Sequence, residues 1–279
     1  IPGVYMLKTD LTDLGAIDML FYELFPDAVI HLGCMSKPAD VLAQPERSRE
    51  INVDASLRIA ELCAEGDIPM VFTSTGLVFD GVKGNYTEDS PQEPPNLYGE
   101  QKAEAEKGIM ERHPEAVICR LSWTYGPPTK GNQSFIQPML EAVRAGRVLE
   151  EFVDIFASPS SVRAVMNGFF LAMEKGSGTF HLGEVKGPGI FHLGEVKDSA
   201  IFHLGGVKRM SRFEFARELL AAYELPEEAV KPRCLKDATD GVKRARDTSL
   251  ISAKAVALGY DPLPHSEELR LIREYESTS

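Results

Sequence analysis

The feature that most constrains the fold of this chain is a regular alternation of short apolar runs with amphipathic helical patterns. Each apolar run has the length of a strand, and each helical pattern repeats its apolar residues every three or four positions. This order is typical of a parallel sheet whose strands are joined by crossover helices. We therefore expect an α/β protein with a Rossmann-like, doubly wound parallel sheet. The predicted strands are residues 4–7, 28–34, 70–74 and 117–122, and the predicted helices are residues 16–25, 48–65 and 97–112.

The regular alternation of strand and helix patterns changes after Tyr125, where a loop rich in glycine and proline begins. We predict a smaller, mixed substrate lobe there, with a cleft between the two units at the carboxyl ends of the strands, where open α/β sheets bind ligands. Helices are predicted at residues 134–145 and 160–174 and after a capping box at Ser211–Glu214, and a strand at residues 179–182. The predicted nucleotide-binding unit comprises residues 1–125 and 158–208, and the predicted lobe comprises residues 126–157 and 209–279.

The composition argues against several classes of protein. The 279 residues carry a formal charge of −12, which disfavours a general affinity for nucleic acid or for an anionic membrane. No apolar stretch approaches the roughly 18 residues of a membrane span. The four cysteines are far apart and form no C-x-x-C pair, which disfavours a zinc or disulfide framework and favours a reducing cytoplasm. Cys34 and Cys119 fall in predicted strands, where we expect them to be buried.

A Phe-His-Leu-Gly motif occurs three times in tandem and places histidines at His181, His192 and His203. Three histidines are enough to suggest a metal site, but no acidic or cysteine partner recurs with them, so we predict no bound metal. A tandem duplication is the simpler interpretation. We expect one copy to form a strand of the sheet and the other two to form an inserted loop.

Tyr98 and Lys102 are the candidate centre of the chemistry, because residues four apart share one face of a helix. A nearby ammonium favours the phenolate, so we expect Lys102 to lower the pKa of Tyr98 from its usual value near 10 and to make it a proton donor. The spacing alone also fits a solvated helix face. However, the preceding strand ends in Ser74 and Thr75, and one of these hydroxyls would meet a substrate oxygen at the same sheet edge. Together the residues indicate nicotinamide-dependent carbonyl reduction.

Three longer motifs carry a resemblance to a known family. They are residues 72–81 (FTSTGLVFDG), residues 95–102 (PNLYGEQK) and residues 120–127 (RLSWTYGP). With these motifs the chain resembles the extended short-chain dehydrogenase/reductases, and most closely their dTDP-4-dehydrorhamnose reductase branch. The resemblance extends over nearly the whole chain.

The resemblance implies that NADPH or NADH delivers hydride to the 4-keto group of a nucleotide sugar. Tyr98 would donate the proton, Lys102 would bind the nicotinamide ribose, and Thr75 would orient the carbonyl. The resemblance places Asp10 and Leu11 against the adenine, His31, Leu32, Gly33 and Leu121 along the cofactor cleft, and Ser74 and Trp123 beside the substrate.

Three residues also have a purely structural interpretation that the sequence leaves open. Asp10 fits a cap of the turn that follows it, and Asn52 fits a residue that ties down a helix. Trp123 fits a core residue as well as a border of the substrate site.

Two parts of the family pattern are missing from the sequence. None of the 23 glycines belongs to a G-x-x-G-x-x-G turn of the kind that holds the pyrophosphate, and the first β-α-β unit is not found. We expect further residues before Ile1, with a degenerate protein as the alternative. In addition, Gly76 and Leu77 stand where the rhamnose branch usually has Asp-Tyr. The choice between NADP and NAD and the identity of the sugar therefore stay open.

A second function from a different class also fits. Residues 37–45 and 52–56 resemble the regulatory β subunit of methionine adenosyltransferase, a nucleotide-binding protein that acts on a partner enzyme. A nucleotide-sugar reductase is the leading hypothesis, a non-catalytic regulatory subunit is the alternative, and a purely structural protein is third. A homodimer is left open by the sequence.

Overall fold

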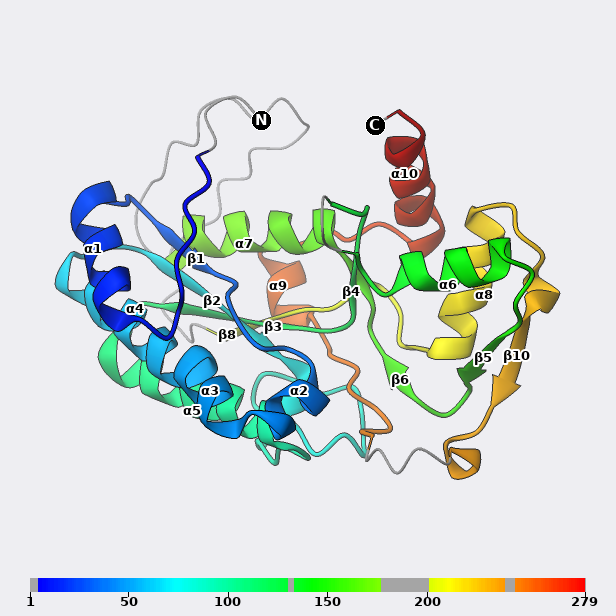
Figure 1. Ribbon diagram of the computed structural model, residues 1–279, viewed down its shortest axis with the longest axis horizontal. Helices are drawn as coiled ribbons and strands as arrows, with labels where there is room; N and C mark the ends of the chain where they lie inside the picture. The colour runs from blue at the N-terminus through cyan, green and yellow to red at the C-terminus, as the bar shows by residue number, and fades with distance from the viewer. Residues whose placement is uncertain (1–4, 130–132, 177–200, 239–243, 279) are drawn as a thin grey trace.

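The computed structural model describes residues 5–129, 133–176, 201–238 and 244–278. Its larger unit is built on one sheet with the strand order β1-β2-β3-β8 (Figure 1). All three strand pairings are parallel and helices cover both faces, so the predicted doubly wound α/β fold is confirmed. The strands are β1 (Val29–His31), β2 (Met70–Thr75), β3 (Val117–Leu121) and β8 (Ile201–Leu204).

The core of the larger unit has two halves, because alternate strand residues point to opposite faces of the sheet. Met70 and Phe72 of β2 pack under the helices of one face. Val71 packs under the helices of the other face. The first face is covered by α1 (Leu14–Leu24), α4 (Ala55–Glu65) and α5 (Leu97–Arg112), and the second by α7 (Val162–Gly176) and α9 (Ala253–Ala257).

A separate hydrophobic cluster forms the smaller unit, in which Leu140, Phe215 and Leu269 bring three helices together. The predicted capping box is present: Ser211 Oγ accepts from the Glu214 N–H at 3.1 Å, and the Glu214 carboxylate accepts from the Ser211 N–H at 2.7 Å. The elements of this unit are α6 (Ile136–Arg144), α8 (Arg212–Ala222), α10 (His265–Thr278), β5 (Leu149–Phe152) and β10 (Val230–Arg233).

Residues 246–252, here called the connecting segment, lie between the loop after β2 and the strand β6 (Phe156–Ala157) and form a β-bridge with each. The Arg246 N–H donates to the Gly81 carbonyl at 2.8 Å, and the Thr248 N–H donates to the Phe156 carbonyl at 3.0 Å. Beyond it, Ala255 packs in the core of the sheet, so the chain returns to the larger unit before α10. The division of the chain into two ligand-binding units stays a prediction. Two short pairings also lie here, β4 (Thr124–Tyr125) with β7 (Ser160–Ser161) and β6 (Phe156–Ala157) with β9 (Met210–Ser211).

Some predicted elements differ from the structure. The predicted strand at residues 4–7 is wrong for residues 5–7, which pair with no other strand. Tyr5 is 90% exposed and Met6 is 91% exposed. A strand needs a neighbour for its backbone hydrogen bonds, and within the described chain β1 pairs with β2 alone. The helix at residues 48–65 is divided by a π-helical turn (Glu50–Asp54), which separates α3 (Pro45–Arg49) from α4; α2 (Pro38–Ala43) precedes them.

The third copy of the tandem motif forms β8, as expected for one copy. The strand predicted at residues 179–182 and the other two copies lie outside the described residues. In the part of the chain that the structure describes, no helix combines the length and apolarity needed to cross a bilayer.

Candidate active site

The carboxyl end of β2 meets the first turn of α5 at one edge of the sheet. β2 ends at Thr75, whose Oγ1 accepts a hydrogen bond from the Leu77 N–H at 3.2 Å. Among the described residues Thr75 Oγ1 serves only as an acceptor, which leaves its hydroxyl proton available to a substrate oxygen. A Cβ atom at Gly99 would lie 2.1 Å from the carbonyl oxygen of Leu77. Glycine at this position therefore lets α5 begin directly against the turn that follows Thr75.

Tyr98 lies in the first turn of α5 and is 7% exposed. The helix is capped by Asn96, whose side chain accepts from the Gly99 N–H at 3.0 Å. Burial raises the pKa of the Tyr98 phenol, and the neighbouring Cys34 side chain raises it further. This direction is opposite to the one expected from the spacing of Tyr98 and Lys102. Removal of the phenol from water is the largest effect, and it favours the neutral form.

Lys102 lies one turn further along α5 and is 1% exposed. Its Nζ atom is 3.8 Å from the centroid of the Phe72 ring. Burial lowers the pKa of Lys102 to about 8, whereas Cys34 and Glu106 act in the opposite direction. The ammonium is therefore removed from water but is still the major form at neutral pH.

A cleft of about 360 Å³ opens beside these residues, and Asp10 and Leu11, which the resemblance assigns to the cofactor, are among the residues that line it. Cys34 lines the cleft and also borders Tyr98 and Lys102, so the cleft adjoins the pair. Sequence reasoning places Cys34 in a buried strand, but it lies beyond the end of β1 and is half-buried. Cys34 follows Gly33 directly at the end of a predicted strand, and this position is the signal in the sequence that could have identified it as a site residue. The other lining residues, which no motif singles out, are Lys8, Thr9, Met35, Arg47 and Ile51.

The three residues predicted along the cleft at the end of β1 have different surroundings. His31 is buried, with Nε2 3.0 Å from Ser56 Oγ, and burial, with a smaller effect of the Lys102 charge, lowers its pKa to about 3. Leu32 is 52% exposed. A Cβ atom at Gly33 would lie 2.5 Å from Leu11 Cδ1, so glycine lets this cleft residue pack onto the end of β1.

Asp10 and Asn52 have the structural roles that the sequence left open. Asp10 Oδ1 accepts from the N–H and from the hydroxyl of Thr12, both at 3.0 Å, and so caps the following turn. Asn52 is fully buried, accepts from the Met35 N–H at 2.8 Å and donates to Gln101 Oε1 at 2.9 Å. Asn52 therefore fastens a wall of the cleft to α5.

Ser74, Leu121 and Trp123 lie around the same edge of the sheet. Ser74 is 4% exposed, and its hydroxyl has no hydrogen-bond partner among the described residues. Leu121 ends β3 directly opposite Thr75 in the register of the sheet. Trp123 is half-buried rather than part of the core, and the Arg212 guanidinium of the smaller unit lies 5.3 Å from its ring.

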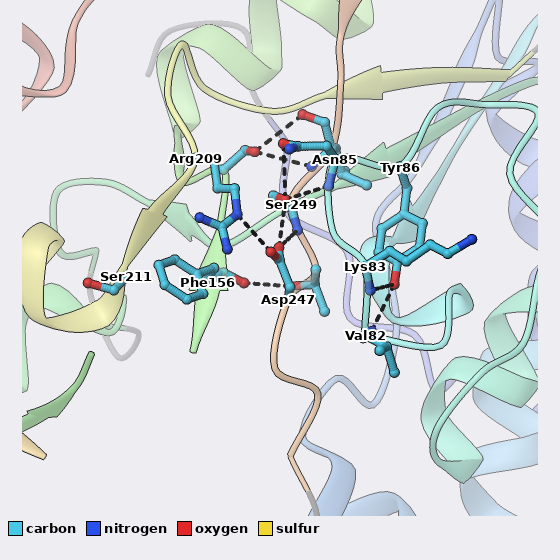
Figure 2. Close-up of polar contacts among 12 residues, drawn as sticks. Val82, Lys83, Asn85, Tyr86, Phe156, Arg209, Ser211, Asp247 and Ser249 are labelled. Atoms are coloured by element: carbon cyan, nitrogen blue, oxygen red, sulfur yellow. Dashed lines mark hydrogen bonds and ion pairs between the residues drawn. The ribbon is translucent and has the colours of Figure 1, made fainter. Parts of the chain in front are cut away.

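A polar network holds the connecting segment beside this edge. Asp247 is 2% exposed and accepts hydrogen bonds from Arg209 Nε at 2.7 Å, from Ser249 Oγ at 2.6 Å and from the Ser249 N–H at 3.0 Å (Figure 2). The Asn85 N–H donates to Ser249 Oγ at 2.7 Å. The loop that follows β2 is thereby fixed to the connecting segment.

The connecting segment accounts for one departure from the family pattern. A Cβ atom at Gly76 would lie 2.9 Å from the Thr248 carbonyl oxygen and 3.4 Å from Leu250 Cδ2. The backbone of the connecting segment therefore fills the space beside Gly76, and an aspartate side chain there would have to displace it. Sequence reasoning cannot find Thr248, because the contact joins residues far apart in the chain.

The histidines of the tandem motif are the candidate metal ligands that the sequence suggests. His203 is fully buried, with Nδ1 3.1 Å from the Tyr86 carbonyl oxygen and Nε2 3.5 Å from Arg120 Nη1. His181 and His192 lie outside the described residues. Within residues 5–129, 133–176, 201–238 and 244–278, no group of three or more histidine, cysteine or acidic side chains is placed to hold a metal ion.

Known proteins share this sequence pattern over most of its length. Residues 3–274 match the RmlD substrate binding domain family. The β subunit of methionine adenosyltransferase 2 from Rattus norvegicus is 26% identical over 261 residues, which cover 90% of this chain and 71% of that protein. The probable low-salt glycan biosynthesis reductase Agl14 of Haloferax volcanii is 30% identical over 181 residues, which cover 63% of this chain and 60% of that protein.

The fold is also shared with solved structures. The crystal structure of dTDP-4-dehydrorhamnose reductase from Bacillus anthracis in complex with NADP superposes with a TM-score of 0.81 at 20% identity, covering 98% of this chain and 90% of that chain. At this identity the likeness establishes a Rossmann-like fold. Because the family match spans almost all of the sequence, the chain belongs to the RmlD substrate binding domain family.

Proposed function

We propose that the protein reduces the 4-keto group of a nucleotide sugar with NADPH or NADH. The observation that carries the proposal is the gathering of Thr75, Tyr98 and Lys102 at one sheet edge, beside a cleft of about 360 Å³. The similarity to a dTDP-4-dehydrorhamnose reductase supports the substrate class. A location in a reducing cytoplasm stays part of the proposal and is supported by four free cysteines.

The residues of the cleft suit a dinucleotide. Leu11, Met35 and Ile51 offer apolar surface for a base, and Lys8 and Arg47 offer cations for phosphate. Within this sequence, the nucleotide would be held through these residues and through Lys102. When bound, the reduced nicotinamide supplies the hydride.

The chain's own residues supply the proton. The free hydroxyl proton of Thr75 orients the sugar carbonyl, and Tyr98 donates its phenolic proton to the carbonyl oxygen. Burial raises the pKa of the phenol, so Tyr98 carries its proton at the start of the reaction, and the Lys102 ammonium has to offset that rise for the proton to be transferred. The phenolate left afterwards lies one turn from the Lys102 ammonium, which stabilises the negative charge.

The alternative is a non-catalytic, nucleotide-binding regulatory subunit. It is favoured by the similarity to the β subunit of methionine adenosyltransferase 2 over 90% of this chain. The replacement of the usual Asp-Tyr pair by Gly76 and Leu77 points the same way, because it removes two polar groups beside the reacting centre.

Cofactor binding and turnover distinguish the two functions. The purified full-length protein is titrated with NADPH and with NADH by fluorescence, and dTDP-4-keto sugars are then added while the absorbance of the reduced nicotinamide is followed. Binding with turnover supports the reductase. Binding without turnover, together with co-purification of a methionine adenosyltransferase, supports the regulatory subunit, and no binding of either nucleotide refutes the reductase.

The substitution Tyr98→Phe tests the proton donor. We expect turnover to fall by about 100-fold or more, the usual effect of losing a general acid, while the Kd for NADPH changes little. Tyr22→Phe is the matched control, because Tyr22 is 74% exposed on α1. If Tyr98→Phe turns over at the rate of the control, Tyr98 does not have the proposed role.

A further inference from the structure

A buried ion pair joins α5 to β3 one turn beyond Lys102. Arg120 and Glu106 are 2% and 3% exposed, and Arg120 donates to the Glu106 carboxylate from Nη2 at 2.7 Å and from Nε at 3.0 Å. Gln92 Nε2 donates to the same carboxylate at 2.5 Å, and Arg120 Nη1 donates to the Glu88 carbonyl at 3.2 Å. The pair therefore ties together the helix, the strand and the loop that joins β2 to α5.

Attachment of α5 alone does not explain this pair. Ala105 and Ile109 of the same helix already pack in the core of the sheet. An exposed pair, Arg49 with Glu104 at 2.6 Å, holds the outer side of the helix. Burying two more charges costs solvation that hydrophobic residues of similar size would not lose. A buried pair at this position therefore suggests a role beyond attachment.

The surroundings of Lys102 indicate what that role is. Glu106 lies four residues after Lys102, so the two side chains share one face of α5. Two other titratable groups interact with the ammonium, His31 at the end of β1 and Cys34 after it, and Tyr98 lies one turn before Lys102 on α5. His31 is neutral, so Glu106 is the carboxylate of this group, and Arg120 keeps it in place.

We propose that Glu106, held by Arg120, is a positioning residue for Lys102: it locks this turn of α5 onto β3 and faces the buried ammonium with a negative charge. Burial lowers the pKa of Lys102, and Glu106 opposes that change. Without Glu106, a larger share of Lys102 would be uncharged near neutral pH. The inference rests on the proposed function only for its consequence, which is weaker cofactor binding and slower turnover.

The titration of Lys102 tests the charge directly. The protein is labelled with isotope-enriched lysine, the Lys102 signal is assigned with Lys102→Met, and its NMR shift is followed against pH. We expect a midpoint of about 8 in the parent protein. In Glu106→Gln the midpoint should fall by about one pH unit, because a buried opposite charge on the same face of α5 is lost. In the matched control Glu104→Gln it should stay unchanged.

A midpoint in Glu106→Gln equal to that of the parent overturns the proposal. If Glu106→Gln does not fold because Arg120 is left unpaired, the double variant Glu106→Gln with Arg120→Gln is compared with Arg120→Gln alone. These two proteins differ only in the Glu106 charge, so an equal midpoint in both overturns the proposal. Glu106→Asp keeps the charge and should restore the midpoint most of the way. A role limited to packing would move the melting temperature and leave the midpoint in place.

Cofactor affinity links the residue to function. If Lys102 binds the cofactor, the Kd for NADPH at pH 8 should rise by about fivefold in Glu106→Gln and stay constant in Glu104→Gln, because less of the ammonium is charged. A parent protein that binds no NADPH would refute the proposed function, while the titration of Lys102 would still decide the role of Glu106.

Discussion

The sheet edge at β2 and α5 and the flank at β1 and α1 are built in opposite ways. At the edge, charged side chains such as Lys102, Glu106 and Arg120 are almost fully buried and closely packed. At the flank, Tyr22 and Phe25 of α1 and its cap are 74% and 75% exposed. This reverses the usual preference of charged residues for the surface and of large apolar residues for the interior. Buried charge marks the place where chemistry is proposed, and the flank has no comparable constraint.

The two regions should therefore differ in their tolerance of change. At the edge, a methyl group added to a glycine collides with the backbone, and a side chain whose charge is changed is too buried to be solvated by water. At the flank, side chains extend into solvent, and a substitution disturbs little packing.

The largest effect is expected for Gly99→Ala. The added methyl group would meet the Leu77 carbonyl oxygen at 2.1 Å, so the start of α5 has to move away from β2. We expect a loss of about 3 kcal/mol in the free energy of unfolding, at the upper end of overpacking effects, and a loss of turnover because Tyr98 moves with the helix. Urea unfolding and the reductase assay measure the two effects.

Gly15→Ala on α1 is the matched control, because its added methyl group would lie 3.4 Å from Asp13 Oδ1, an ordinary contact. We expect it to unfold within about 1 kcal/mol of the parent, on the more stable side. If both variants lose the same stability, the contrast between edge and flank is wrong.

The second largest effect is expected from acid, which should lower the free energy of unfolding through two buried histidines. Burial lowers the pKa of His31 to about 3, helped by Lys102, and that of His203 to about 3, helped by Arg120. In the unfolded chain both titrate near 6.5, so below that pH the unfolded state binds more protons and stability falls as the pH drops toward 3. At pH 5.5 we expect each histidine to cost about 1.4 kcal/mol relative to pH 7.5.

Denaturant unfolding at pH 7.5 and pH 5.5 measures this loss. His203→Gln cannot titrate and should therefore reduce the difference between the two pH values by its own share. An unchanged difference in His203→Gln would show that His203 is protonated without penalty.

The smallest effect is expected at the flank, for Phe25→Gly. Phe25 ends α1 with φ 45°, in the left-handed region that favours glycine, and its side chain is 75% exposed. We expect a gain of about 0.5 kcal/mol in stability, because relief of the backbone strain outweighs the weak packing of a largely solvated ring. Tyr22→Ala on the same helix should stay within about 0.5 kcal/mol of the parent. A large loss in either variant would mean that the flank is a packed surface in solution.

Many elements of both units were predictable because their signals are local. The helix Leu97–Arg112 has the predicted bounds, and the capping box at Ser211 is present. Apolar periodicity and capping residues depend only on near neighbours in the chain. The predicted strand at residues 4–7 is wrong for residues 5–7, because pairing depends on a neighbouring strand, which local patterns do not report.

The same distinction between local and long-range information applies to the candidate site. The sequence by itself determined that Thr75, Tyr98 and Lys102 meet at one sheet edge, because strand ends and helix faces follow from spacing. Only the tertiary structure decided that Cys34 joins the cleft to that pair, that Thr248 fills the space beside Gly76, and that burial raises the pKa of Tyr98. Desolvation and long-range contact depend on what the rest of the chain places around a residue, and no local pattern contains that information.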